Sequence, residues 1–264
     1  MYDGTAHDCK LYSYHVCDCG QSCGFHILND LKKFMKMGTK ISSYTVILGT
    51  LLVLSFGCKK EEAPPGPVTD IDGISYRTVK IGDQIWMAEN LKTTRYNDGT
   101  EISLIKDATI WNGLKTGGYC WYKNDESLYR DPYGAIYNGY AAGTGKLCPA
   151  GWHVPEKEDW LKLREFTGDT IKGGGKLKES GIDHWLTPNK GADNSSGFTA
   201  LPSGMRYFEG TFTSLLTFAG IWSSTETGIK DLWYMSLYYG DAAFTISHMT
   251  KNHGFSVRCI KDDL

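Results

Sequence analysis

The 264-residue chain lacks an excess of charge of either sign. Lys and Arg number 28 and Asp and Glu number 30, which leaves a formal net charge of −2. Nucleic-acid-binding domains usually present a basic face, so this balance gives no support to a nucleic-acid partner. No internal repeat of the lengths expected for solenoids or propellers is present. The remaining composition, 41% hydrophobic, is that of a globular protein with room for a substantial core.

Familiar catalytic and metal-binding spacings are also absent. The histidines at 153, 184, 248 and 253 form no H-E-x-x-H or H-x-H pattern, and no G-x-S-x-G serine motif occurs. We therefore expect no metal and no cofactor, and we assign no catalytic residue. A binding or structural role is favoured over catalysis.

Proline is scarce, with 8 residues, whereas Gly reaches 31 and aromatic residues 13%. This composition favours strands and turns over a helical bundle. Hairpins are predicted around Gly82-Asp83 and Gly240-Asp241. Short strands are predicted at 119–125, 135–142, 221–226 and in the C-terminal run 254–262.

The clearest helix signal follows Trp152. Pro155 is suited to a first helical position, acidic residues follow it, and Gly168 ends the pattern. Trp160, Leu163 and Phe166 would share one face. A second short helix is predicted at 175–180.

The N-terminal region contains an apolar run at 41–56, too short for the ~20 residues of a membrane-spanning helix. Lys36 and Lys40 precede it and Gly57-Cys58 follow, so the segment resembles a bacterial lipoprotein signal in which Cys58 is lipidated. Ser55 stands where that pattern usually has Leu. The alternatives are a plain signal peptide and an anchor helix with an incidental Cys.

This assignment sets the predicted domain limits. The signal peptide covers 35–57, with Met35 or Met37 as the start. Residues 1–34 would be an unstructured upstream segment, although its Cys9, Cys17, Cys19 and Cys23 invite a zinc hypothesis. Residues 58–73, charged and rich in Pro, would form a flexible tether, and 74–264 the folded domain.

The acidic pair after Cys58 and two lysines, KKEE, is similar to export tags that send lipoproteins to the outer face of the outer membrane. We therefore expect an exported protein that is anchored to the outer membrane and displayed on the cell surface. The alternative is an anchor that faces the periplasm.

Seven segments, in order, carry a family resemblance: WMAENL, YCWYKND, KLCPAGWHVPEKEDW, GGKLKES, GFTALPSGMR, IWSSTE and GFSVRC. Residues 70–262 resemble the Fibrobacter succinogenes major paralogous domain family. That family is similar to the C-type-lectin-like fold, in the branch shared with formylglycine-generating enzyme. The resemblance implies an α+β domain with two short helices packed on antiparallel sheets with long loops.

The chain departs from both functional patterns of that fold. The E-P-N, Q-P-D and W-N-D strings with which lectins hold calcium are missing, which argues against a lectin-type calcium site. The paired cysteines of the oxidase are missing too, since Cys259 is alone near the C-terminus. Cys259 instead resembles the terminal-strand cysteine of the fold.

Export permits disulfides among Cys120, Cys148 and Cys259. We expect a Cys148–Cys259 bond, which would tie the start of the first helix to the last strand. Cys120–Cys148 and Cys120–Cys259 stay open as alternatives, because connectivity does not follow from spacing. The third thiol would be buried and inert.

Aromatic residues near the C-terminus supply the candidate ligand site. Alternation predicts that Trp233, Met235, Leu237 and Tyr239 face the core, while Tyr234 and Tyr238 form an exposed strip. Tyr234, Tyr238 and Tyr207 would contact sugars or proteins. The alternative is that neighbouring loops half cover these tyrosines. Asp193 and Asn194 would supply loop oxygens, with an Asx turn as the alternative.

We expect a lipid-anchored bacterial surface module that binds a glycan or a surface protein without catalysis. An exported hydrolase with an unassigned site and a subunit of a surface adhesion assembly are the alternatives. A pocket with paired carboxylates would favour the first alternative, and an open sheet edge the second.

Overall fold

The computed structural model describes residues 65–263. These lie within the compact unit Glu62–Leu264. The predicted upstream segment 1–34, the signal peptide 35–57 and the lipidation site Cys58 lie outside the described residues. Within 65–263, no helix combines the length and apolarity that crossing a membrane requires.

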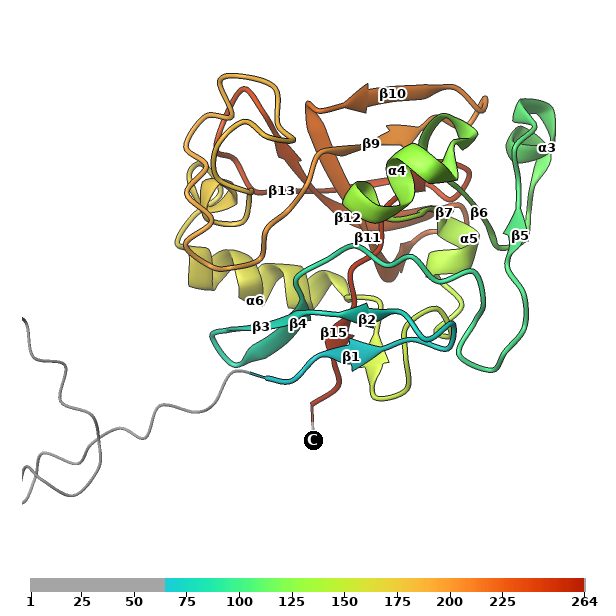
Figure 1. The fold of residues 1–264 in the computed structure, drawn as a ribbon, viewed down its shortest axis with the longest axis horizontal. Coiled ribbons are helices and arrows are strands. Elements are labelled where there is room, and N and C mark those ends of the chain that lie inside the picture. The colour runs from blue at the N-terminus through green and yellow to red at the C-terminus, as the bar shows by residue number, and fades with distance from the viewer. Residues whose placement is uncertain (1–64, 264) are drawn as a thin grey trace, which may run out of the picture. The chain divides into compact units, whose positions relative to one another are not determined.

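A mixed nine-stranded sheet forms the centre of the domain (Figure 1). Its strands in spatial order are β13 (Thr245–Thr250), β12 (Asp231–Tyr238), β11 (Phe218–Thr227), β9 (Ser203–Arg206), β14 (Gly254–Phe255), β7 (Ile136–Asn138), β6 (Gly118–Cys120) and β5 (Ser103–Leu104), and β10 (Phe212–Leu215) pairs with β9. The pairs β11–β9 and β5–β6 are parallel and the others antiparallel. The prediction of antiparallel sheets was therefore wrong for this sheet.

A second sheet has four strands, β3 (Thr78–Ile81), β4 (Gln84–Met87), β15 (Ile260–Lys261) and β8 (Trp152–His153). The β3–β4 hairpin turns at Gly82-Asp83, as predicted. The hairpin β12–β13 around Gly240-Asp241 is also confirmed. The C-terminal run does not form one strand: β14 joins the large sheet and β15 the small one, so this run connects the two sheets.

The described residues contain four α-helices where two were expected. They are α3 (Ala108–Gly113), α4 (Glu126–Tyr133), α5 (Gly139–Ala142) and α6 (Lys157–Thr167), with 3-10 turns η1 (Tyr122–Asn124) and η2 (Gly173–Lys176). Side chains of Asp107, Asp125 and Asn138 cap the N-termini of α3, α4 and α5. Such caps satisfy free backbone N–H groups. Of these helices, only α5 replaces part of a predicted strand, the end of 135–142, whose first half forms β7. The fold class, α+β, is confirmed.

Helix α6 differs from its prediction at its N-terminal end. Its first helical residue is Lys157 rather than Pro155, and Glu156 occupies the N-cap and forms a capping box with Asp159. Gly168 ends the helix as predicted. Trp160 and Leu163 are buried, but Phe166 is 58% exposed. Because an α-helix has 3.6 residues per turn, Phe166 lies outside the buried face that Trp160 and Leu163 share, and its ring lies near Gly82.

The large sheet has a hydrophobic core on each of its faces. Trp222 and Leu232 belong to one cluster, while Ile221, Met235 and Leu237 belong to the other. Alternation along β11 and β12 therefore directs apolar side chains both ways. Helix α6 and the small sheet cover the second cluster, where the Trp86 and Trp160 rings stack with centroids 4.7 Å apart.

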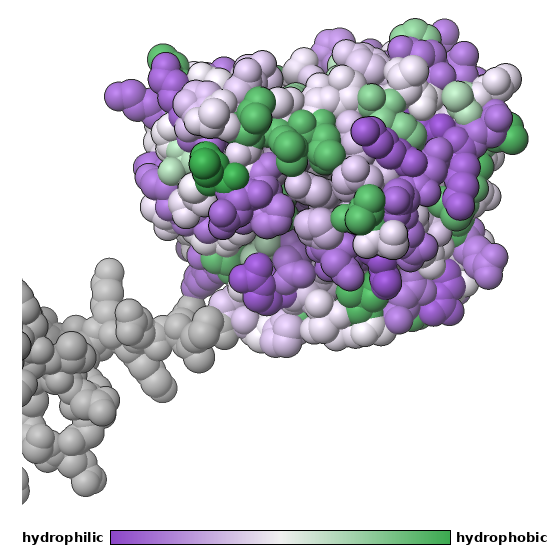
Figure 2. Space-filling model, turned by 45° about the horizontal axis from the view of Figure 1, so that its top comes forward, coloured by the Kyte–Doolittle hydropathy of each residue, from purple (hydrophilic) through white to green (hydrophobic). Residues whose placement is uncertain are grey.

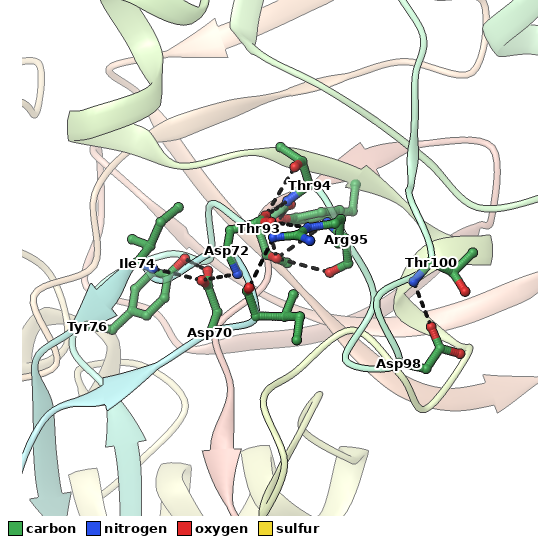
Figure 3. A network of polar contacts seen from close by, with 11 residues as sticks. Asp70, Asp72, Ile74, Tyr76, Thr93, Thr94, Arg95, Asp98 and Thr100 are labelled. Atoms are coloured by element: carbon green, nitrogen blue, oxygen red, sulfur yellow. Dashed lines mark hydrogen bonds and ion pairs between the residues drawn. The ribbon is translucent and has the colours of Figure 1, made fainter.

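The N-terminal hairpin β1 (Val68–Thr69) and β2 (Ser75–Tyr76) belongs to the fold. Figure 3 shows the carboxylates of its turn joined to neighbouring groups: Asp70 accepts from the Tyr76 hydroxyl at 2.6 Å, and Asp72 accepts from Thr94 N at 2.6 Å and Arg95 Nε at 2.5 Å. Residues 68–73, predicted as the end of the tether, are thus paired and hydrogen-bonded, and the folded domain begins before residue 74.

Candidate functional site

The structure does not gather the predicted tyrosines on one surface. The Tyr234 ring packs inward, stacked on Phe255 with centroids 4.7 Å apart and edge-on to Trp222 at 6.3 Å. The expected solvent-facing strip is wrong here because β12 lies inside the sheet with a core on both sides.

Tyr238 and Tyr207 are exposed but contact different neighbours. Tyr238 ends β12, 46% exposed, with its ring against Tyr239. Tyr207 follows β9, and its ring lies edge-on to that of His253. No ring contact joins these two tyrosines within residues 65–263.

Asp193 and Asn194 form the Asx-type turn that was the alternative to a loop supplying oxygens to a ligand. Asp193 Oδ1 accepts from Ser195 N at 2.8 Å, which lowers the pKa of the Asp193 carboxyl. Asn194, at φ 53°, bonds the backbone N–H and the hydroxyl of Thr199. Asp193 Oδ1 and Asn194 Oδ1 thus both accept hydrogen bonds within the loop and stabilise it. Among residues 65–263, no group of three or more His, Cys, Asp or Glu is placed to hold a metal ion.

A concavity of about 640 Å³ lies where β12 begins, beside Ile229 and Lys230. We call it the His253 groove. It is lined by Asn112, Lys115, Tyr140, Phe208, Ile229, Lys230, Thr250, Asn252 and His253. Figure 2 shows one face of the molecule, where hydrophobic residues form separate groups between polar ones rather than one continuous apolar surface.

Five segments build the groove. Asn252 Nδ2 donates to the carbonyls of Asn112 and Leu114, and so joins the β13–β14 connection to the end of α3. The His253 ring lies edge-on to Phe208 at 5.6 Å, which fixes the β9–β10 turn on it. Tyr140 comes from α5. Turns and helix ends supply most of the lining, while the sheets hold them in place.

The groove combines ring faces with polar groups. Burial lowers the pKa of His253, so its imidazole is neutral at neutral pH, and Nδ1 lies 2.8 Å from Thr250 Oγ1. Phe208 is 48% exposed and Ile229 90%, while Lys115 and Lys230 are also exposed. Aromatic rings beside amides and ammonium groups can stack on and hydrogen-bond a polar ligand. Sequence reasoning missed this site because its residues are scattered from 112 to 253.

A smaller concavity of about 230 Å³ has a charged lining. We call it the Arg258 pocket, and its charged residues are Arg77, Glu89, Lys92, Asp131, Glu179, His184 and Arg258. None of its lining residues belongs to the His253 groove.

Among residues 65–263, the buried side chains of Arg206 and Arg258 have no carboxylate as a hydrogen-bond partner. Arg206 donates to the carbonyls of Gly210, Ile105 and Lys106. Arg258 donates to Asn90 Oδ1 and to backbone carbonyls. Glu226 forms an ion pair with Lys251.

The predicted disulfide is confirmed: Cys148 and Cys259 are bonded, with Cα atoms 5.9 Å apart. It joins the segment before β8 to the segment before β15. Cys120 is a buried free thiol, and burial raises its pKa to about 12. A thiol with that pKa is unreactive at neutral pH.

These features define the class of domain: an α+β body closed by one disulfide and carrying a concave surface groove lined by aromatic rings. The sequence profile of the Fibrobacter succinogenes major domain matches residues 79–261, and the chain belongs to this family. No curated protein matches the chain, and no solved structure matches it.

Proposed function

We propose that this protein is a lipid-anchored module of the bacterial cell surface that binds a glycan in the His253 groove, without catalysis. We also propose that the domain has the C-type-lectin-like fold. The α+β class and the disulfide between the segment before α6 and the segment before the last strand support this assignment. The anchor is supported by the lipoprotein-like signal that ends at Cys58.

One observation carries the ligand class: the groove places the rings of Tyr140, Phe208 and His253 beside the amides of Asn112 and Asn252. Sugars present apolar ring faces and hydroxyl edges, so aromatic stacking combined with amide hydrogen bonds suits them. The ammonium groups of Lys115 and Lys230 favour an acidic glycan.

A glycan array probed with the purified chain tests this proposal. Binding should fall at least about tenfold in Phe208→Ala and Tyr140→Ala, since each removes a stacking face. Tyr238→Ala is the matched control, because it removes an exposed tyrosine outside the groove. If no glycan on the array binds and a surface protein is captured through the same groove, the ligand is a protein and not a glycan.

The anchor has its own test. In bacterial cells, Cys58→Ala should abolish incorporation of a labelled fatty acid and release the protein from the membrane fraction. Retention of the label in this variant would contradict lipidation at Cys58. Surface display would be checked by protease accessibility in intact cells.

A role in a surface assembly is the second candidate, and the edge of the large sheet favours it. β13 ends the sheet, and no strand among residues 65–263 pairs with its outer side. Its six residues contain no Lys or Pro, the residues that commonly protect an edge. Ile246→Lys should reduce self-association measured by light scattering if copies pair along this edge.

A further inference from the structure

At the floor of the Arg258 pocket lies a guanidinium that no carboxylate contacts. Arg258 is 1% exposed, and its hydrogen bonds go to Asn90 Oδ1 and the carbonyls of Phe198 and Thr199. A guanidinium has five N–H donors, and the second N–H of Nη1 has no acceptor among the described residues. Burial lowers the pKa of Arg258 to about 9, and the nearby carboxylate of Glu89 offsets this only in part.

Arg206 is the informative comparison. Its guanidinium is also buried without a carboxylate, and it lies over the rings of Trp111 and Phe212, at 4.4 and 4.8 Å, as that of Arg258 lies over the ring of Phe198, at 4.2 Å. Arg206 lines neither the His253 groove nor the Arg258 pocket. Arg258 differs because it lines a cavity.

A second cation stands beside this floor. The Lys92 side chain is 13% exposed, and its Nζ lies 3.6 Å from Asp131 Oδ1 and 3.9 Å from Glu89 Oε2. Both separations exceed those of charge-assisted hydrogen bonds, about 2.7–2.9 Å. The ammonium is therefore held near carboxylates with donors still available to a ligand.

Acidic oxygens occupy other walls of the pocket. Glu179 is 19% exposed and both its oxygens lie 2.9 Å from His184 Nδ1, and Glu89 is 27% exposed. The lining contains equal numbers of carboxylates and of Lys or Arg cations: Glu89, Asp131, Glu179, Arg77, Lys92 and Arg258. A ligand with a large net charge of either sign would be repelled by half of these groups, whereas a ligand with separated opposite charges would satisfy both.

We propose that the Arg258 pocket binds a small zwitterion that carries one carboxylate and one ammonium group, of the size of a free α-amino acid. The carboxylate accepts from Arg258 Nη1 and the Lys92 ammonium, and the ligand ammonium donates to Glu179. The volume of about 230 Å³ lies below the ~300–1,000 Å³ of sites for drug-sized ligands. This site is independent of the glycan groove, since the two share no residue.

Thermal unfolding and calorimetry of the purified full chain with a panel of free amino acids test the proposal. At least one member should raise the unfolding temperature in a concentration-dependent manner, because a ligand that binds only the folded state stabilises it. Lys92→Gln and Glu179→Gln should each weaken that binding at least about tenfold. Lys172→Gln and Glu158→Gln, at exposed charged positions outside the pocket and the groove, should leave it unchanged.

Ligand analogues test the charge requirement in the unaltered protein, and so do not depend on the folding of any variant. The N-acetyl derivative lacks the ammonium group and the amide derivative lacks the carboxylate; each should bind at least about tenfold more weakly than the parent amino acid. The proposal is overturned if no amino acid binds at millimolar concentration, or if both analogues bind as tightly as the parent. Binding that survives in a folded Lys92→Gln/Glu179→Gln protein would place the ligand elsewhere.

Discussion

Lys178 shows how one buried residue holds distant loops together. It is fully buried, and its ammonium donates to the carbonyls of Lys190, Tyr238 and Asp241 at 3.0, 3.1 and 2.7 Å. Burial lowers the pKa of Lys178 to about 8. The three hydrogen bonds offset much of the cost of burying this charge. They also connect the loop that contains Lys190 to the β12–β13 turn.

Replacing Lys178 by Met should destabilise the domain by about 3 kcal/mol, because three buried carbonyl oxygens lose their donor. The free energy of unfolding in urea measures this loss. Lys172→Met, at an exposed position in the same region, should change it by less than about 0.5 kcal/mol. Equal stability of the two variants would show that the buried bonds contribute nothing.

His153 makes stability depend on pH. Its ring lies between Asp159, at 3.2 Å, and Asp262, at 2.6 Å, and these carboxylates raise the pKa of His153 from 6.5 to about 9. The folded state therefore binds the proton more tightly than the unfolded state. The added stability is complete below about pH 6.5 and is lost as the pH rises towards 9.

The stability difference between the unaltered protein and His153→Gln should accordingly shrink from pH 6.5 to 9. Its size should be of the order of 1 kcal/mol, since the side chain is partly exposed and solvent screens the pair. Urea unfolding at several pH values measures it, and the subtraction removes the contribution of Lys178. A difference independent of pH would contradict the paired imidazolium.

At the scale of elements, η2 shows where local sequence and packing disagree. The prediction of a helix over 175–180 was wrong, and a 3-10 turn covers Gly173–Lys176. Its three glycines are buried and let the turn approach two neighbours closely. A Cβ at Gly174 would collide with the carbonyl of Ala243 in the β12–β13 connection, and a Cβ at Gly175 would collide with the carbonyl of Gly191. Backbone contact, rather than helix propensity, decides the conformation.

Gly174→Ala should therefore cost about 3 kcal/mol of unfolding free energy, since backbone atoms must move to admit the methyl group. Gly113→Ala is the control, because nothing lies within 4 Å of its Cβ position and its φ is not positive. Thermal unfolding of both variants checks the prediction. A Gly174→Ala protein as stable as Gly113→Ala would mean that the contact relaxes freely.

At the scale of the whole molecule, the disulfide closes a loop across a sequence separation of 111 residues. The chain-entropy account assigns such a loop up to about 4–5 kcal/mol, and delivered values are often lower. The bond also supports a C-terminal run that contributes strands to two sheets. The fold is thus closed by its last few residues.

Cys148→Ser/Cys259→Ser should lower the free energy of unfolding by up to about 4 kcal/mol, with the transition followed by tryptophan fluorescence. Cys120→Ala, which removes a buried thiol and leaves the loop closed, should cost about 1 kcal/mol. A double variant as stable as Cys120→Ala would show that packing alone closes the domain.

The sequence by itself determined the elements whose cues are local. The turns at Gly82 and Gly240 set the two hairpins, and Gly168 set the end of α6. The segment order determined the family and, through it, the α+β class. The structure, not the spacing, chose the Cys148–Cys259 bond from the three possible pairings. Alternation along β12 identified Met235 and Leu237 as core residues, whereas Trp233 and Tyr239, predicted with them, are only partly buried.

Only the tertiary structure decided which side chains share a surface. Alternation distinguishes two faces of a strand but cannot show that both are covered, which is why Tyr234 was predicted exposed. The His253 groove and the Arg258 pocket each draw residues from segments more than a hundred positions apart. Such proximity arises from long-range packing of turns on sheets, for which no local pattern in the chain carries a signal.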